Sequence, residues 1–197
     1  MAYLGCGAKD LFITWRKLFS LSQSWFELTL ITPLSSLDPP PEGTLKLNND
    51  GSFLEDFGCL GAGGVVRNHD GDWIAGLSHY EIGGDVLLAE LRAIQICLDF
   101  CSKKDYVKII CESDFLEAVD LIIVGCDHTL HTYATVIFHI RDALHENGIW
   151  TLVHVLREQN TCADFMTKEG SHARCSGHWK CSPPDMESLI LREKFET

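Results

Sequence analysis

Four acidic residues of this 197-residue chain occur among apolar or small neighbours, in the order Asp, Glu, Asp, Asp. They are Asp50 in KLNNDGS, Glu90 in LLAELRAI, Asp114 in VKIICESDF and Asp164 in REQNTCADF. An isolated carboxylate is costly in such surroundings, because burying an unpaired charge is strongly unfavourable. Carboxylate oxygens are the ligands that Mg²⁺ prefers, and two such cations held together can hydrolyse a phosphodiester. The four residues therefore indicate a carboxylate cluster that binds two metal ions.

Glu90 lies on an apolar stripe of its expected helix and not on the solvent-facing side. Leu87, Leu91, Ile94 and Leu98 follow one another by three- and four-residue steps, and Glu90 falls among them. A Glu that is buried in this way needs a partner, and either a cation or a nearby Lys or Arg would serve.

The other three acids are expected near the ends of regular elements, where structural roles also stay open. Asp50 and Asp114 follow apolar strands, and open α/β sheets place their sites at strand ends. Asp50 precedes Gly51, a pair typical of a turn, and Asp114 could cap a helix that begins at Phe115. Asp164 is expected one turn into a helix, where an acid favours the helix dipole. The order and spacing of the four together favour the metal cluster.

Apolar periodicity and turn signals predict an α/β fold with a five-stranded mixed sheet. The expected strands span residues 45–52, 61–68, 72–81, 107–113 and 150–156. The second and third form a hairpin around Asp70-Gly71, and Gly83-Gly84-Asp85 can cap the helix that follows. The expected helices span residues 86–101, 115–124, 131–146, 161–168 and 185–194, and Asn160 is expected to cap the fourth. Three antiparallel strands followed by alternating helices and parallel strands would place helices on both faces of the sheet.

Changes in composition divide the chain into three expected parts. Residues 1–42 hold apolar residues at helical spacing and end in a Pro-rich linker; a helix there would pack on the core, bind a partner or lie on a membrane surface. Residues 43–170 hold the sheet and the four acids, and residues 171–197 form a tail with a short helix. A zinc site in this tail stays open as an alternative, because His172, Cys175, His178 and Cys181 recur every three residues.

The overall composition is that of a soluble globular protein, with 46% hydrophobic and 22% charged residues. No apolar run reaches the ~18 residues of a membrane span, and the N-terminus lacks the pattern of a secretory signal. We therefore expect an intracellular protein of the nucleus or cytoplasm. Most of the nine cysteines, Cys97, Cys101 and Cys111 among them, are expected to be reduced core thiols. The net charge of −12 argues against a nonspecific nucleic-acid binder.

Five segments, taken together, resemble the ribonuclease H family, most closely the plant retroelement-derived, reverse-transcriptase-like domains. In family order they are KLNNDGS, GAGGVVRNHDGDWIAG, LLAELRAIQICL, VKIICESDFLEAV and HVLREQNTCADFMTK. The resemblance implies a ribonuclease H-like fold over residues 43–170 and an endonuclease that hydrolyses the RNA strand of RNA–DNA hybrids. It implies that Asp50, Glu90, Asp114 and Asp164 hold two Mg²⁺ or Mn²⁺ ions. We further expect that backbone groups near Gly51 and Ser52 contribute to substrate binding and that the protein is a monomer.

The sequence departs from the family pattern at two places. Family enzymes often carry a histidine on the loop before the last acidic helix, whereas His154 here falls within the expected fifth strand. Polar side chains that contact RNA 2′-hydroxyls are replaced by Val86, Leu87, Phe115 and Leu116. These changes predict a slow enzyme with weaker selectivity for RNA. They leave open a second possibility, a domesticated, non-catalytic module that binds nucleic acid or protein.

Overall fold

A computed structural model describes residues 40–124, 131–147 and 149–195, all of which belong to one compact unit, Ser35–Thr197. The helix expected within residues 1–42 falls outside the described residues. None of the described helices is both long enough and apolar enough to cross a membrane.

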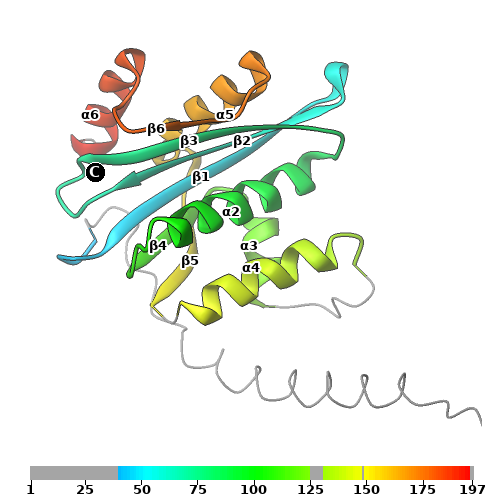
Figure 1. Ribbon diagram of the computed structural model, residues 1–197, viewed down its shortest axis with the longest axis horizontal. Coiled ribbons are helices and arrows are strands. Elements are labelled where there is room, and N and C mark those ends of the chain that lie inside the picture. The colour runs from blue at the N-terminus through cyan, green and yellow to red at the C-terminus, as the bar shows by residue number, and fades with distance from the viewer. Residues whose placement is uncertain (1–39, 125–130, 148, 196–197) are drawn as a thin grey trace, which may run out of the picture. The chain divides into compact units, whose positions relative to one another are not determined.

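The chain alternates between strands and helices much as the apolar pattern predicts (Figure 1). The strands are β1 (Leu45–Leu54), β2 (Cys59–Arg67), β3 (Trp73–Ile82), β4 (Ile109–Ser113), β5 (Trp150–His154) and β6 (Gly177–Trp179). The α-helices are α2 (Val86–Lys103), α3 (Leu116–Ile123), α4 (Ala134–Glu146), α5 (Thr161–Ala173) and α6 (Glu187–Phe195). Short 3₁₀ helices occur at η1 (Glu55–Phe57), η3 (Arg157–Gln159) and η4 (Pro184–Met186).

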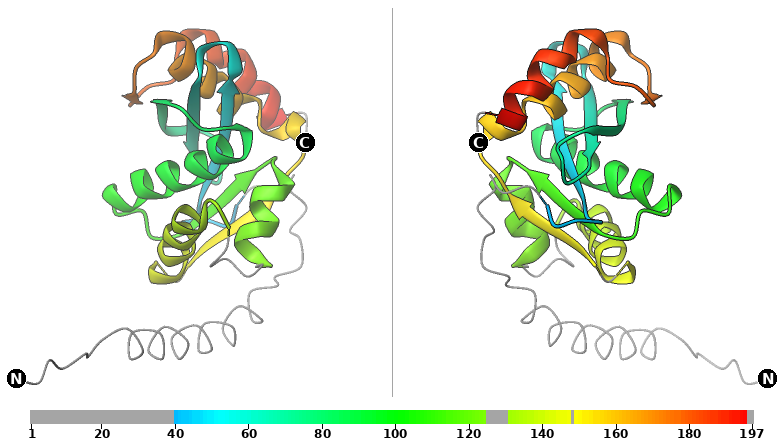
Figure 2. Two further views of the ribbon diagram at one scale, coloured as in Figure 1. Left: turned by 90° about the vertical axis from the view of Figure 1, so that its right-hand side faces the viewer. Right: turned by 90° about the vertical axis from the view of Figure 1, so that its left-hand side faces the viewer.

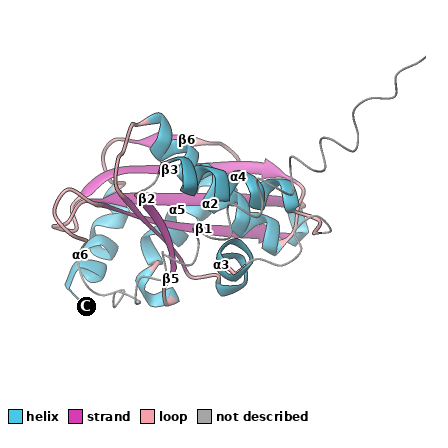
Figure 3. Ribbon diagram, turned by 90° about the horizontal axis from the view of Figure 1, so that it is seen from below, coloured by secondary structure: helices cyan, strands magenta, loops and turns pink. Residues whose placement is uncertain are grey.

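The strands form one mixed sheet in the order β5-β4-β1-β2-β3-β6. β1, β2 and β3 are antiparallel neighbours that run side by side in Figure 3, and β4 and β5 add in parallel on the other side of β1. The prediction of a mixed sheet with helices is confirmed, but the number of strands was one too few. The sixth strand, β6, pairs with β3 over three residues only and was missed because so short a segment shows no alternation.

The β2–β3 hairpin and the start of α2 use the turn and cap residues that the sequence predicts. Asn68 Oδ1 accepts hydrogen bonds from the backbone N–H groups of Asp70 and Asp72, and Gly71 adopts a φ of 77° that favours glycine. Asp85 Oδ1 accepts from the backbone N–H of Leu88, 2.9 Å away, and so caps α2.

The larger part of the hydrophobic core lies between the sheet and α2, α3 and α4. The apolar stripe of α2 is buried there, with Leu91, Ile94 and Leu98 fully covered. Cys97, Cys101 and Cys111 are free, buried thiols within or beside the same core, as expected. This packing fixes the rotation of α2 and therefore the direction of Glu90.

α5 and α2 pack on opposite faces of β2 (Figure 2). Two neighbouring glycines of β2 allow each helix to lie close to the strand. A Cβ atom on Gly63 would come 2.2 Å from the Thr167 nitrogen of α5, whereas one on Gly64 would come 2.4 Å from Cys97 Sγ of α2. α5 continues beyond the predicted end near Lys168 to Ala173. The missing side chain of Gly170, inside α5, lets the helix lie directly on the backbone of β3.

Candidate functional site

Three of the four predicted acids lie within a strand or a helix, and the fourth directly follows a strand. Asp114 directly follows β4, and Asp164 lies in the first turns of α5. Glu90 projects from α2 and is 6% exposed, which confirms its predicted burial. Asp50 is 8% exposed and lies inside β1, opposite Gly63, so the expectation that it ends a strand or forms an Asp-Gly turn was wrong. β1 runs four residues beyond Asp50 because β2 continues to pair with it.

Burial and mutual repulsion raise the pKa values of the two inner carboxyl groups. Burial raises the pKa of Asp50 to about 7, and the charges of Asp114 and Asp164 add to the increase. Burial likewise raises the pKa of Glu90 to about 9, and Asp50 and Asp114 add to it. Asp50 therefore lies within electrostatic reach of the other three acids, and in the metal-free protein both inner groups hold their protons to a higher pH than usual.

Hydrogen bonds from two neighbouring residues hold the Glu90 side chain and the Asp50 backbone. The Gly51 backbone N–H donates to Glu90 Oε2 over 3.1 Å, and Thr167 Oγ1 donates to the Asp50 carbonyl oxygen over 2.8 Å. The Gly51 N–H, one of the backbone groups expected to contact the substrate, is thus already used within the protein. The Ser52 hydroxyl is buried and has no hydrogen-bond partner among the described residues.

Asn160 was predicted to cap α5, but its side chain makes no capping hydrogen bond and positions Asp114 instead. Its Nδ2 donates to Asp114 Oδ1 over 3.0 Å and to the Asn49 carbonyl oxygen over 2.8 Å. Asp114 is not the cap of α3 either, because that position belongs to Phe115. The side chain of Asn160 therefore connects β1, the end of β4 and the start of α5.

Asp164 is engaged by a lysine from its own helix. Lys168 Nζ lies 2.5 Å from Asp164 Oδ2, and the two side chains are 58% and 34% exposed. Over residues 40–124, 131–147 and 149–195, no three or more His, Cys, Asp or Glu side chains are arranged to hold a metal ion. This applies to the acids and to His172, Cys175, His178 and Cys181 alike. A cation bound through Asp164 would first have to displace Lys168.

The chemistry of the acidic residues nevertheless fits a divalent cation. Oxygen donors of carboxylates are what Mg²⁺ and Mn²⁺ prefer, and two of these groups are buried with raised pKa values, so their negative charges are poorly compensated. The Asn160 Oδ1 atom, whose amide contacts Asp114, is buried without a hydrogen-bond partner in the described part of the chain. A bound cation would supply the missing positive charge.

Arg157 is a residue of the site that the sequence did not single out. Its side chain is exposed in η3, the short loop before α5, and its positive charge lowers the pKa values of both Asp50 and Glu90. His154 is exposed at the end of β5. Val86 and Leu116 are 48% and 52% exposed, so the substitutions at the expected RNA-reading positions leave apolar side chains on the surface. The loop arginine could have been noticed because it is the only Lys or Arg between His154 and Asp164.

Comparisons with known proteins agree with this fold. The sequence profile of a family described as reverse transcriptase-like matches residues 48–170. A protein of Arabidopsis thaliana named "putative ribonuclease H protein" is 29% identical over 155 residues, which cover 78% of this chain and 25% of that protein. The chain thus spans about a quarter of the length of this relative.

Two crystal structures of ribonucleases H superimpose on the domain. The RNase H1 of the halophilic archaeon Halobacterium salinarum is 20% identical with a TM-score of 0.59, over 64% of this chain and 96% of that one. LC11-RNase H1, solved in complex with an RNA/DNA hybrid, is 20% identical with a TM-score of 0.59, over 66% of this chain and 99% of that one. At this identity the structures establish a common fold. Together with the profile, which covers more than half of the sequence, they show that the chain belongs to the reverse transcriptase-like family and carries a ribonuclease H family domain.

Proposed function

We propose that this domain is a metal-dependent endonuclease that hydrolyses the RNA strand of RNA–DNA hybrids. The observation that carries the proposal is the pair of buried carboxyl groups, Asp50 and Glu90, whose pKa values are raised to about 7 and about 9 beside Asp114 and Asp164. Perturbed acids grouped in this way are typical of functional sites. The relative that was solved with an RNA/DNA hybrid has the same fold and supports the choice of substrate.

Asp50, Glu90, Asp114 and Asp164 would hold two Mg²⁺ or Mn²⁺ ions. When bound, such ions would lower the pKa of a coordinated water and stabilise the negative charge on the leaving oxygen. The remaining roles belong to the chain itself. Gly51 holds Glu90 through its backbone N–H, and Asn160 holds Asp114. We expect Lys168 to release Asp164 on metal binding and then to face the phosphate backbone, where a positive charge is favourable.

Arg157 would contact the phosphate of the strand that is cleaved. Its exposed guanidinium lowers the pKa values of Asp50 and Glu90, so a positive charge that solvent can reach lies within electrostatic reach of both acids. In an overall acidic protein with a net charge of −12, such a local cation would offset the repulsion of the phosphate backbone. We therefore expect binding that weakens steeply as salt concentration rises.

The test is cleavage of a uniformly labelled RNA–DNA hybrid at low salt with Mg²⁺ or Mn²⁺, by the wild type and by Asp50→Asn. The wild type should produce fragments with 5′-phosphate and 3′-hydroxyl ends, and Asp50→Asn should produce none, because an amide cannot supply the anionic ligand. Glu117→Gln, which changes an exposed acid on α3, is the matched control and should cleave as the wild type does. Equal product from the wild type and Asp50→Asn would trace the activity to a contaminant.

A non-catalytic interaction module is the second candidate. Two observations favour it. Lys168 competes with a metal ion for Asp164, and the net negative charge of the protein repels a polyanionic substrate. Binding of the hybrid without cleavage in the same assay, unchanged by chelation of Mg²⁺, would favour the module over the enzyme.

A further inference from the structure

The first turn of α5 needs hydrogen-bond acceptors that its own N-cap residue does not provide. The first N–H groups of a helix have no partners within the helix and are usually capped by the side chain at the N-cap. Asn160 occupies that position, but its side chain makes no capping bond and is used on Asn49 and Asp114. The helix that carries Asp164 therefore depends on an acceptor from elsewhere.

Glu193, on the C-terminal helix α6, supplies that acceptor. Its Oε1 atom accepts from the Cys162 backbone N–H over 2.7 Å and from Thr161 Oγ1 over 2.6 Å. Its Oε2 atom lies 2.6 Å from Arg67 Nη1, and the two side chains are 3% and 8% exposed. A buried carboxylate at a helix N-terminus accepts charge-assisted hydrogen bonds and also interacts favourably with the helix dipole.

The neighbours of Glu193 on α6 place its carboxylate at this point. Leu189 and Ile190, four and three residues earlier, lie on the same side of the helix as Glu193. Both pack against a second hydrophobic cluster that contains Cys162, Met166 and Met186. Because this cluster joins α5 to α6, the docking of α6 carries the carboxylate of Glu193 to the first turn of α5.

Arg67 connects Glu193 to the strand that carries Asp50. Its Nη2 donates to Asn48 Oδ1 over 2.5 Å, and Asn48 Nδ2 donates in turn to Glu112 Oε2 over 2.9 Å. Arg67, Asn48 and Glu112 are 6%, 0% and 3% exposed. A continuous buried polar network thus runs from β4 and β1 through β2 to Glu193 and the start of α5.

We infer that Glu193 is a positioning residue, which fixes the first turn of α5 and through it the place of Asp164 in the proposed metal site. Asp164 lies two residues after Cys162, whose N–H Glu193 accepts. Loss of the cap would let this turn fray, and a displacement of about 1 Å can reduce the rate of a reaction by about a hundredfold. Residue 193 lies beyond the profile match at residues 48–170, so a segment outside that match would complete the site. The inference rests on the proposed function.

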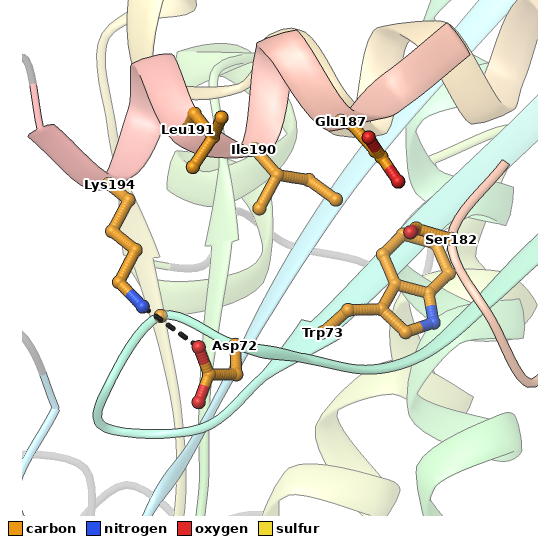
Figure 4. A pocket seen from close by; sticks show the side chains of 8 residues that line it. Asp72, Trp73, Ser182, Glu187, Ile190, Leu191 and Lys194 are labelled. Carbon is orange, nitrogen blue, oxygen red and sulfur yellow. Dashed lines mark hydrogen bonds and ion pairs between the residues drawn. The ribbon is translucent and has the colours of Figure 1, made fainter. Parts of the chain in front are cut away.

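The neighbouring residue offers a matched control. Lys194 Nζ lies 2.8 Å from Asp72 Oδ1 and ties the same helix to the β2–β3 turn, along an open pocket that Trp73, Ile190 and Leu191 also line (Figure 4). Neither group of this ion pair contacts α5 in the interactions described for it. This ion pair is partly exposed and contributes little to stability, so Lys194→Ala removes a contact of the same helix and leaves both the docking of α6 and the cap in place.

The experiment compares wild type, Glu193→Ala, Glu193→Gln and Lys194→Ala as full chains, well below their melting temperatures. Amide hydrogen exchange, measured by NMR, should accelerate at Cys162 and Asp164 by about tenfold or more in Glu193→Ala and remain unchanged in α2. Glu193→Gln keeps an acceptor oxygen and should restore most of the protection. In hybrid cleavage, Glu193→Ala should lower kcat by about ten- to a hundredfold with KM unchanged within about twofold, and raise the Mg²⁺ concentration needed for half-maximal rate. Lys194→Ala should match the wild type in every readout.

Unchanged exchange at Cys162 in Glu193→Ala would overturn the inference, as would equal losses of activity in Glu193→Ala and Lys194→Ala. A wild type that neither cleaves the hybrid nor binds Mg²⁺ in calorimetry would overturn the proposed function and, with it, the role of Glu193 toward the metal site. The exchange data would then still decide separately whether Glu193 caps α5.

Discussion

Glu90→Gln should make the metal-free protein more stable, by an amount that grows with pH. Glu90 has a pKa raised to about 9 in the folded protein, against an ordinary value of 4.5 in the unfolded chain. Between these values the folded state keeps a proton that the unfolded state releases, so the stability conferred by the protonated group is lost as pH rises. The slope is about −1.4 kcal/mol per pH unit for one proton, or about 4 kcal/mol from pH 5 to pH 8. A glutamine at this position stays neutral at every pH and can still accept the hydrogen bond of the Gly51 N–H. The variant therefore does not lose stability as pH rises.

The assay is urea unfolding of both proteins in EDTA at several pH values. The difference in free energy of unfolding should be small at pH 5 and reach about 4 kcal/mol at pH 8, a large part of a typical domain stability of about 5–15 kcal/mol. Burial lowers the pKa of His79 from its ordinary value of 6.5, so this group makes the folded state more stable as pH rises towards 6.5. Both proteins contain His79, so its contribution cancels in the difference. A difference that stays constant from pH 5 to pH 8 would refute the reasoning, because it would mean that Glu90 ionises alike in the folded and unfolded states.

Three further predictions follow from the same site. Millimolar Mg²⁺ should raise the melting temperature of the wild type, with about 2.7 kcal/mol of stabilisation at a hundred times the dissociation constant, and Asp50→Asn should show no such shift. Lys168→Ala should tighten Mg²⁺ binding by up to about fivefold in calorimetry, because Asp164 loses its competing partner; weaker binding would contradict the competition. Gly63→Ala should cost about 2 kcal/mol or more in chemical unfolding, since its Cβ would lie 2.2 Å from a backbone nitrogen of α5, whereas Gly177→Ala, with nothing nearer than 3.6 Å, should be close to neutral.

The sequence predicted best those features that depend on local periodicity. The apolar stripe of α2 predicted both the helix and the burial of Glu90, because side chains three and four residues apart share one face. The hairpin and the cap at Asp85 were predictable because their residues form their hydrogen bonds within a few positions of the chain. In each case the interaction and its sequence signal lie close together.

Features that depend on distant pairing were not predictable. Asp50 was expected at a strand end, but β2 extends the pairing of β1 past it, and nothing within KLNNDGS indicates that partner. The pairing of Lys168 with Asp164 could have been anticipated from their four-residue spacing. The cap at Cys162 could not, because its acceptor, Glu193, lies 31 residues away. The sequence thus predicted the burial of Glu90 but not the contacts that orient the four candidate acids.

The three-residue strand β6 has a consequence for solubility. It pairs with β3 at Gly76, Leu77 and Ser78, in the middle of a ten-residue strand that would otherwise form a long, open edge of the sheet. Open edges of this length expose unpaired N–H and C=O groups to which strands of other molecules can add, and short edge strands are a common protection against such addition. A chain that ends before residue 177 would lose this cover, and its β3 edge would become a site for self-association during expression.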